Sequence, residues 1–137
     1  MIPKVAIASS VIFMLACGQN PSRSTHEMSS SYPQESRTLT AAEAYKRWKE
    51  NPDQVVILDV RTPDEYQGGH IKGAQNLNLY DDFEKAIQKL PKDKEYYLHC
   101  ASGRRSGMAM EIMRKHGFRA YNLGGYRDLV QAGFPKE

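Results

Sequence analysis

The loop that follows Cys100 combines the residue types that nucleophilic catalysis by a thiolate requires. Residues 99–106 read HCASGRRS and join a predicted strand to a predicted helix. The backbone N–H groups after the cysteine have no helical partner and can form an anion-binding nest, in which Gly103 permits a tight curve. The helix N-terminus, Arg104 and Arg105 add positive charge. Because these features favour thiolate over thiol, we predict a lowered pKa for Cys100 and a nucleophilic role.

Alternating helix and strand patterns surround this loop and must position it. The apolar run Val55–Asp59 is typical of a parallel strand that is covered on both faces. Residues 40–43 and 62–65 each have the pattern of a capping box, which predicts a helix beginning at each place. Further strands are expected at residues 75–78, 96–99 and 120–123. Further helices are expected at residues 81–90 and 126–132, and a third runs from the cysteine loop to Gly117.

This alternation predicts an α/β fold with three layers, α/β/α, around a central parallel sheet. Functional sites in such sheets lie at the carboxyl ends of the strands. Cys100 follows the predicted strand 96–99 directly, so it stands at one of those ends.

The composition excludes several other classes of protein. The chain has 137 residues, which supports one ordinary domain. Its net charge of +3 is too small to indicate a nucleic-acid partner. Two cysteines rule out a disulfide framework and a four-thiolate metal site. His26 and His116 have no Cys or acidic cluster at metal-ligand spacing, so we expect no metal and no cofactor.

The first 36 residues have the composition of a targeting segment and a tether. Residues 1–16 contain a short apolar run after one lysine, too short to span a bilayer and typical of a secretory signal peptide. The run ends at LACG, which resembles the lipobox of bacterial lipoproteins, although Met14 stands where these usually have Leu. We expect a lipid on Cys17; the alternative is signal cleavage nearby that leaves Cys17 free. Residues 17–36 predict a flexible polar tether, and residues 37–137 the folded domain.

This organisation predicts a domain in the bacterial cell envelope, on the periplasmic side, held to a membrane through Cys17. The pair that follows Cys17, Gly18-Gln19, lacks the Asp of the enterobacterial retention signal, but the choice between inner and outer membrane stays open. With Cys17 lipidated, Cys100 is the only remaining thiol. An unpaired thiol in an oxidising compartment indicates a functional role.

Three stretches of the chain form a wider pattern around the cysteine. Residues 100–105 have the form C-x-x-G-x-R. Upstream, residues 58–76 contain LDVR, EY, GHIKGA and a final Asn. Downstream, residues 121–126 read YNLGGY before the last predicted helix. Together they resemble the single-domain rhodanese family of sulfurtransferases over about residues 38–135.

The resemblance implies a reaction in two steps through a cysteine persulfide. The thiolate takes a sulfane sulfur from thiosulfate or a similar donor and passes it to cyanide or a thiol acceptor. Cys100 is the implied sulfur carrier, and either arginine of the loop is able to bind the sulfonate end of the donor. The implied cradle for the donor and the persulfide consists of Ala101, Ser102, Gly103, Arg104 and Arg105.

Asp59 and Arg61 lie in the upstream stretch and are interpreted as supporting residues. An acid at the end of a strand anchors a loop more often than it takes part in catalysis. Glu65 is four residues from Arg61, a spacing that permits an ion pair with it. His70, in a glycine-rich turn, is interpreted as structural. His99 points to the opposite face of its strand from Cys100, so we expect it to pack in the core.

Two alternatives to this enzymatic function stay open. The first is a persulfide relay or binding module that serves a protein partner instead of a small-molecule donor and acceptor. The second is a phosphatase or arsenate reductase, which uses a longer loop of the form C-x5-R; here Arg105 stands five positions after the cysteine and Ser106 stands at six. The shorter ring favours a terminal sulfur over a tetrahedral phosphate.

Overall fold

The computed structural model describes residues 37–137. The predicted signal peptide (1–16), the tether (17–36) and the lipid site at Cys17 lie outside the described residues, and the domain boundary at residue 37 stays a prediction. The helices are α1 (Ala41–Glu50), α2 (Pro63–Gln67), α3 (Phe83–Ile87), α4 (Arg104–Lys115) and α5 (Tyr126–Ala132). The strands are β1 (Val55–Asp59), β2 (Gln75–Asn76), β3 (Glu95–Cys100) and β4 (Arg119–Gly125).

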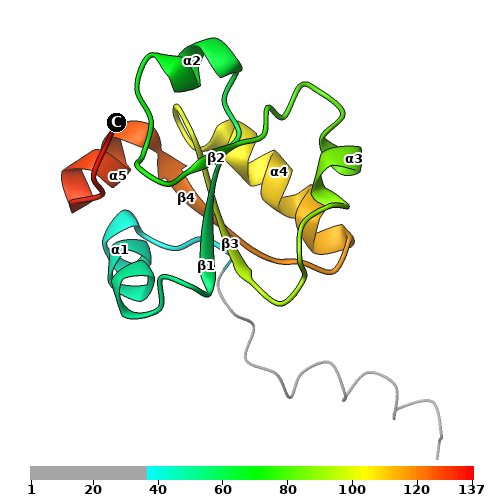
Figure 1. The fold of residues 1–137 in the computed structure, drawn as a ribbon, viewed down its shortest axis with the longest axis horizontal. Coiled ribbons are helices and arrows are strands. Elements are labelled where there is room, and N and C mark those ends of the chain that lie inside the picture. The colour runs from blue at the N-terminus through cyan, green and yellow to red at the C-terminus, as the bar shows by residue number, and fades with distance from the viewer. Residues whose placement is uncertain (1–36) are drawn as a thin grey trace, which may run out of the picture. The chain divides into compact units, whose positions relative to one another are not determined.

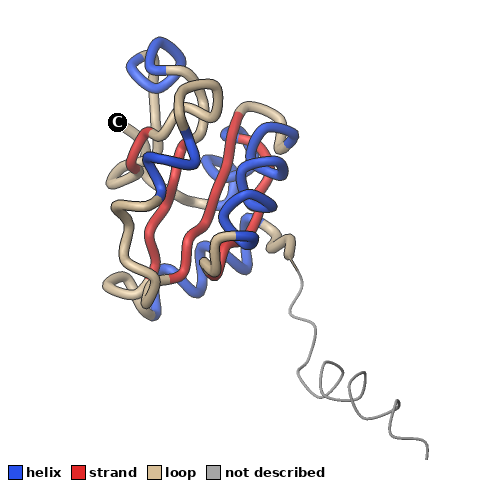
Figure 2. Tube along the Cα trace, turned by 90° about the vertical axis from the view of Figure 1, so that its right-hand side faces the viewer, coloured by secondary structure: helices blue, strands red, loops and turns tan. Residues whose placement is uncertain are grey.

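The four strands form one parallel sheet in the order β2-β1-β3-β4. Helices cover both faces of this sheet: α1 and α5 lie on one side, and α3 and α4 on the other (Figures 1 and 2). The predicted three-layer α/β fold is therefore confirmed.

Each face of the sheet has its own apolar core. On the α3 and α4 side, Leu58, Leu98 and Met113 belong to a buried cluster that also contains Cys100. On the α1 and α5 side, Ile57 and Tyr97 belong to a second buried cluster. Successive residues of β1 and β3 thus point into different cores, which explains why these strands read as continuous apolar runs.

Both predicted capping boxes are present. The Thr40 hydroxyl accepts a hydrogen bond from the Glu43 N–H at 3.1 Å, and the Glu43 carboxylate accepts one from the Thr40 N–H at 3.0 Å. Thr62 and Glu65 make the same reciprocal pair at the start of α2. These contacts satisfy N–H groups that a helix end otherwise leaves unpaired.

Two predicted elements are shorter than the sequence pattern indicates. The strand expected at 75–78 is reduced to β2, Gln75–Asn76. The helix expected at 81–90 is α3, Phe83–Ile87, because Asp82 caps its start and the last turn tightens before Pro91. In that turn, the Leu90 N–H donates to the Ile87 carbonyl, three residues back. Such a turn is common where a helix must end before a proline.

Within residues 37–137, no helix has the length and apolar character needed to cross a bilayer.

Candidate active site

Cys100 is the last residue of β3, at the carboxyl end of the sheet, as predicted. β3 lies between β1 and β4, and Cys100 pairs with Gly125 in the sheet register. The chain then reverses through Gly103, whose φ of 99° lies in the left-handed region that favours glycine. α4 begins at the next residue, Arg104. A strand end and a helix start therefore hold the thiol at the base of a tight loop.

The loop surrounds the cysteine sulfur with hydrogen-bond donors. The Gly103 N–H donates to Cys100 Sγ at 3.0 Å, and the Ser106 hydroxyl lies 3.5 Å from the same sulfur. Burial raises the pKa of the Cys100 thiol, but hydrogen bonds from the Ser106 hydroxyl and from the backbone N–H groups of Ser106, Ser102 and Gly103 outweigh it and lower the pKa. The sequence also predicts a lowered pKa for Cys100. In the structure, however, neutral hydrogen-bond donors lower this pKa more than the charges of Arg104 and Arg105 do.

Ser106 and Asn122 contact the site and were not among the residues that the sequence indicated. Ser106 is fully buried in the first turn of α4, and its hydroxyl lies 2.7 Å from Asn122 Oδ1. Asn122, in β4, also donates from Nδ2 to the Gly103 carbonyl at 3.1 Å and accepts from the Gly124 N–H at 3.0 Å. One amide side chain thus ties the cysteine loop, α4 and the end of β4 together. In the sequence, the signal that could have indicated Asn122 is a polar residue among the apolar positions of a predicted strand.

Glycines let the backbone of β4 approach the loop closely. A Cβ atom built on Gly125 would stand 2.6 Å from the Ala101 carbonyl oxygen. A Cβ atom on Gly103 would stand 3.1 Å from the Gly124 Cα. Packing against the cysteine loop therefore requires Gly125, whereas Gly124 has a φ of 96°, in the left-handed region that favours glycine.

The two loop arginines have different environments. Arg105 donates two hydrogen bonds to the Glu65 carboxylate, at 2.8 and 3.1 Å, and its side chain is only 16% exposed. This pairing raises the pKa of Arg105 and lowers the pKa of Glu65. Arg104 is exposed and forms no ion pair with any of residues 37–137. Glu65 therefore pairs with Arg105 of α4, not with Arg61, the partner that its sequence spacing also permits.

Asp59 and Arg61 form a buried ion pair, with Arg61 Nη2 2.7 Å from Asp59 Oδ2. Arg61 also donates to the Gly69 carbonyl at 2.7 Å, and its guanidinium lies 4.5 Å from the centre of the Tyr126 ring. Asn76 donates to the carbonyls of Asp59 and Arg61. These contacts connect the end of β1 to the glycine-rich turn and to α5, which supports the structural interpretation of both residues.

The two histidines of the site region have structural environments. His99 is fully buried, with Nδ1 3.3 Å from the Cys100 carbonyl and Nε2 3.7 Å from Asp59 Oδ2. Burial lowers the pKa of His99. His70 stacks on the Tyr66 ring, with Nδ1 3.0 Å from the Tyr66 carbonyl. These contacts agree with the packing and structural roles expected for them.

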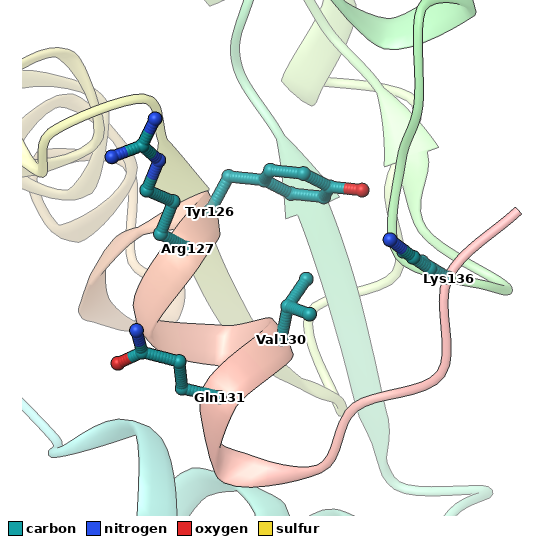
Figure 3. Close-up of a pocket in the computed structure, with 5 residues that line it drawn as sticks. All are labelled: Tyr126, Arg127, Val130, Gln131 and Lys136. Carbon is teal, nitrogen blue, oxygen red and sulfur yellow. The ribbon is translucent and has the colours of Figure 1, made fainter.

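No three His, Cys, Asp or Glu side chains of residues 37–137 gather as potential metal ligands. A hollow of about 260 Å³ lies on α5 and is shown in Figure 3. It is lined by Tyr126, Arg127, Val130, Gln131 and Lys136, and the Tyr126 ring extends toward Lys136. Cys100 is buried and does not line this hollow.

The parallel α/β sheet with a cysteine loop at its carboxyl end places this chain among α/β domains whose candidate site is a single buried thiol. The chain belongs to the rhodanese-like domain family, which it matches over residues 40–132. The match includes both elements that flank the cysteine loop and the Asp59–Arg61 turn.

Several known proteins are similar to this chain. The thiosulfate sulfurtransferase PspE of Escherichia coli is 36% identical over 75 residues, covering 53% of this chain and 72% of that protein. The putative sulfur carrier protein YrkF of Bacillus subtilis is 40% identical over 77 residues, covering 56% of this chain. The chain spans 41% of the length of YrkF and 57% of that of YqhL, an uncharacterised Bacillus subtilis protein that is 41% identical.

Solved structures agree with the fold. The solution structure of a rhodanese-like domain from Anabaena superposes with a TM-score of 0.66 at 28% identity, covering 74% of this chain and 78% of that one. A rhodanese-like domain protein from Staphylococcus aureus superposes with a TM-score of 0.61 at 30% identity, covering 68% and 90%.

Proposed function

We propose that this protein is a sulfurtransferase that moves a sulfane sulfur from thiosulfate or a similar donor to cyanide or a thiol acceptor. The observation that carries the proposal is the set of donors around Cys100 Sγ, which lowers the pKa of the thiol in a loop of the form C-x-x-G-x-R. The similarity to a thiosulfate sulfurtransferase from Escherichia coli and to a thiosulfate:glutathione sulfurtransferase from Saccharomyces cerevisiae supports it.

In the first step, the Cys100 thiolate attacks the sulfane sulfur of thiosulfate. A bond forms between the two sulfurs, the original sulfur–sulfur bond breaks, and sulfite leaves with its electron pair. The negative charge of the persulfide then resides on the outer sulfur. We assign its stabilisation to the backbone N–H groups of the loop, of which those of Ser102, Gly103 and Ser106 also bond to Sγ. In the second step, cyanide attacks the outer sulfur, thiocyanate leaves, and the Cys100 thiolate is restored.

Arg104 is the residue we assign to the sulfonate end of the donor. Its guanidinium is exposed and unpaired within residues 37–137, at the first position of α4. Arg105 is held by Glu65 across 40 positions of sequence, so it braces the loop against α2. In this assignment Arg104 binds the anion, and Arg105 keeps the loop closed.

The experiment is thiocyanate formation from thiosulfate and cyanide, with Cys100→Ser as the inactive control. Saturable turnover that is lost in Cys100→Ser supports the enzyme. The second candidate, a sulfur relay for a protein partner, is favoured by the similarity to the putative sulfur carrier YrkF. Loading of one sulfur on Cys100 without turnover of cyanide would select the relay. Hydrolysis of an aryl phosphate would instead favour the phosphatase alternative.

We further propose that the protein resides in the bacterial cell envelope, on the periplasmic side, anchored through a lipid on Cys17. The apolar run before Cys17 and the polar stretch after it support this location. Intact-mass analysis of protein purified from membranes tests it, since acylation adds the mass of the lipid and removal of residues 1–16 subtracts theirs. A mature chain with an unmodified Cys17 would contradict the anchor.

A further inference from the structure

The orientation of the Asn122 side chain is fixed by its two backbone partners. Its Nδ2 donates to the Gly103 carbonyl, and its Oδ1 accepts from the Gly124 N–H. Oδ1 is therefore an acceptor and has no proton to give. The contact of 2.7 Å between Oδ1 and Ser106 Oγ requires that Ser106 donate its hydroxyl proton to Asn122.

A serine hydroxyl has only one proton, so Ser106 is unable to donate to Asn122 and to Cys100 Sγ at the same time. With its proton on the Asn122 side, Ser106 presents a lone pair to the sulfur 3.5 Å away. That arrangement suits a neutral thiol, whose S–H donates to Oγ. It is unfavourable for a thiolate, because a lone pair would then face a full negative charge.

Rotation about the Cβ–Oγ bond resolves this conflict: the proton leaves Asn122 Oδ1, and the two oxygens, 2.7 Å apart in the structure, move slightly apart. The proton then points to Sγ, while Asn122 Oδ1 keeps the hydrogen bond from the Gly124 N–H. We propose that Ser106 is a positioning residue whose hydroxyl switches between Asn122 and Cys100, donating to Sγ only when that sulfur carries the negative charge.

The effect of this switch on catalysis rests on the proposed function, sulfur transfer through Cys100. In the resting thiolate Ser106 donates to Sγ, and after sulfur loading the charge lies on the outer sulfur, so the proton returns to Asn122. When the acceptor attacks the outer sulfur, the persulfide bond breaks and its electron pair returns to Sγ. Ser106 then donates to Sγ again and stabilises the leaving thiolate, so its largest effect falls on the second step.

The substitution Ser106→Ala removes this hydroxyl and leaves the charged groups around the cysteine unchanged, so the variant measures the effect of the hydroxyl alone. The charged and titratable side chains around the site are Arg104 and Arg105 of α4, Glu65 of α2, His99 of β3, and Asp59 of β1 with its partner Arg61. All of them stay in the variant. Asn122 keeps its bonds to Gly103 and Gly124, so no buried polar group is left unpaired and the loop keeps its ties.

The first test measures the rate of alkylation of Cys100 by iodoacetamide against pH, in a Cys17→Ser background so that one thiol remains. We expect the midpoint of the profile to rise by about one pH unit in Ser106→Ala, a tenfold change in the ionisation constant. Ser106→Thr keeps a hydroxyl and restores most of the difference. Equal midpoints for Ser106→Ala and its parent would overturn the proposal. A merely structural role of Ser106 would lower the melting temperature and leave the midpoint in place.

A second test needs no substitution at Ser106. When the hydroxyl leaves Asn122, the Gly124 N–H becomes the main donor to Oδ1, so its amide proton resonance moves as Cys100 ionises. We expect it to titrate with the midpoint of the alkylation profile. The Gly133 N–H, which bonds to the Val130 carbonyl at the far end of α5, is the control and stays constant through that range. A Gly124 resonance that does not move would contradict the switch.

Neither of these tests uses a sulfur donor. Failure of the protein to load sulfur from thiosulfate would therefore refute the proposed function and leave the switch standing. With sulfur loaded on Cys100, a single discharge by cyanide is expected to be about threefold slower in Ser106→Ala, because thiol leaving groups of higher pKa leave more slowly. Discharge at the parent rate would overturn the catalytic part alone.

Discussion

The closest approach of β4 to the cysteine loop occurs at Gly125. Its φ of −99° is accessible to any residue, so a side chain there is limited by space alone. A Cβ atom would stand 2.6 Å from the Ala101 carbonyl oxygen and 3.3 Å from the Ala101 carbonyl carbon. Both of these are backbone atoms, which cannot move aside by changing a rotamer. Gly125→Ala must therefore displace the loop from the end of β4.

The size of the effect follows from that distance. Real Cβ contacts are essentially never shorter than 3.0 Å, so Ala101 has to move by at least the 0.4 Å that separates 2.6 from 3.0 Å. Overpacking of this kind costs about 1–3 kcal/mol. For a domain of this size, each kcal/mol lowers the melting temperature by about 4–8 °C. Because Ala101 adjoins Cys100, we also expect a loss of sulfur-transfer rate of about tenfold.

Gly68→Ala is the matched control. Gly68 has a φ of −75°, and the nearest atoms to its Cβ position are 3.5 Å away, an ordinary contact. The melting temperature of the Gly68→Ala protein and its rate of thiocyanate formation should equal those of the parent. Thermal denaturation followed by circular dichroism, with the thiocyanate assay on the same samples, compares the three proteins. If Gly125→Ala equals the parent in both measurements, the account of close packing between β4 and the loop is refuted.

Three further predictions concern charges in and below the loop. Arg104→Gln should raise KM for thiosulfate about tenfold at low ionic strength, and added salt should reduce the difference from the parent; equal KM values would remove Arg104 from the donor site. Asp59→Asn leaves the buried Arg61 guanidinium without its counter-charge and should destabilise the domain by about 3–5 kcal/mol in urea denaturation, whereas exposed Asp64→Asn should not. Since the pKa of Cys100 is lowered in the folded state, its ionised form adds stability above the ordinary thiol pKa, and that stability is lost as the pH falls through the lowered value. Denaturation of the Cys17→Ser protein across this range should show the loss, and its absence in Cys100→Ser is the check.

Features set by neighbouring residues could be predicted from the sequence. The capping boxes at Thr40 and Thr62 depend on groups three positions apart, and both are present. The continuous apolar run of β1 indicated a parallel strand covered on both faces, which the two cores confirm. The ends of α3 and β2 were less predictable, because a tightened last turn and the short pairing with β1 decide them.

Contacts across long sequence separations could not be predicted in this way. The sequence spacing permits Arg61 as a partner of Glu65, yet α2 presents Glu65 to Arg105, 40 positions away. The contact of Ser106 with Asn122 depends on the register of β3 and β4, which shifts at an irregularity between Leu98 and His99. That shift also brings Cys100 opposite Gly125. No local sequence pattern indicates such a register shift. The hydrogen bonds of Ser106 with Asn122 and Cys100 could therefore be identified only from the structure.

The most direct measurement of the central claim is the mass of the purified protein after incubation with thiosulfate and removal of the excess donor. We expect the addition of one sulfur atom, located by peptide mapping on the segment that contains Cys100, lost on treatment with cyanide, and absent in Cys100→Ser. A protein that keeps its original mass with the donor in excess, although its Cys100 is free and the domain is folded, would contradict the account.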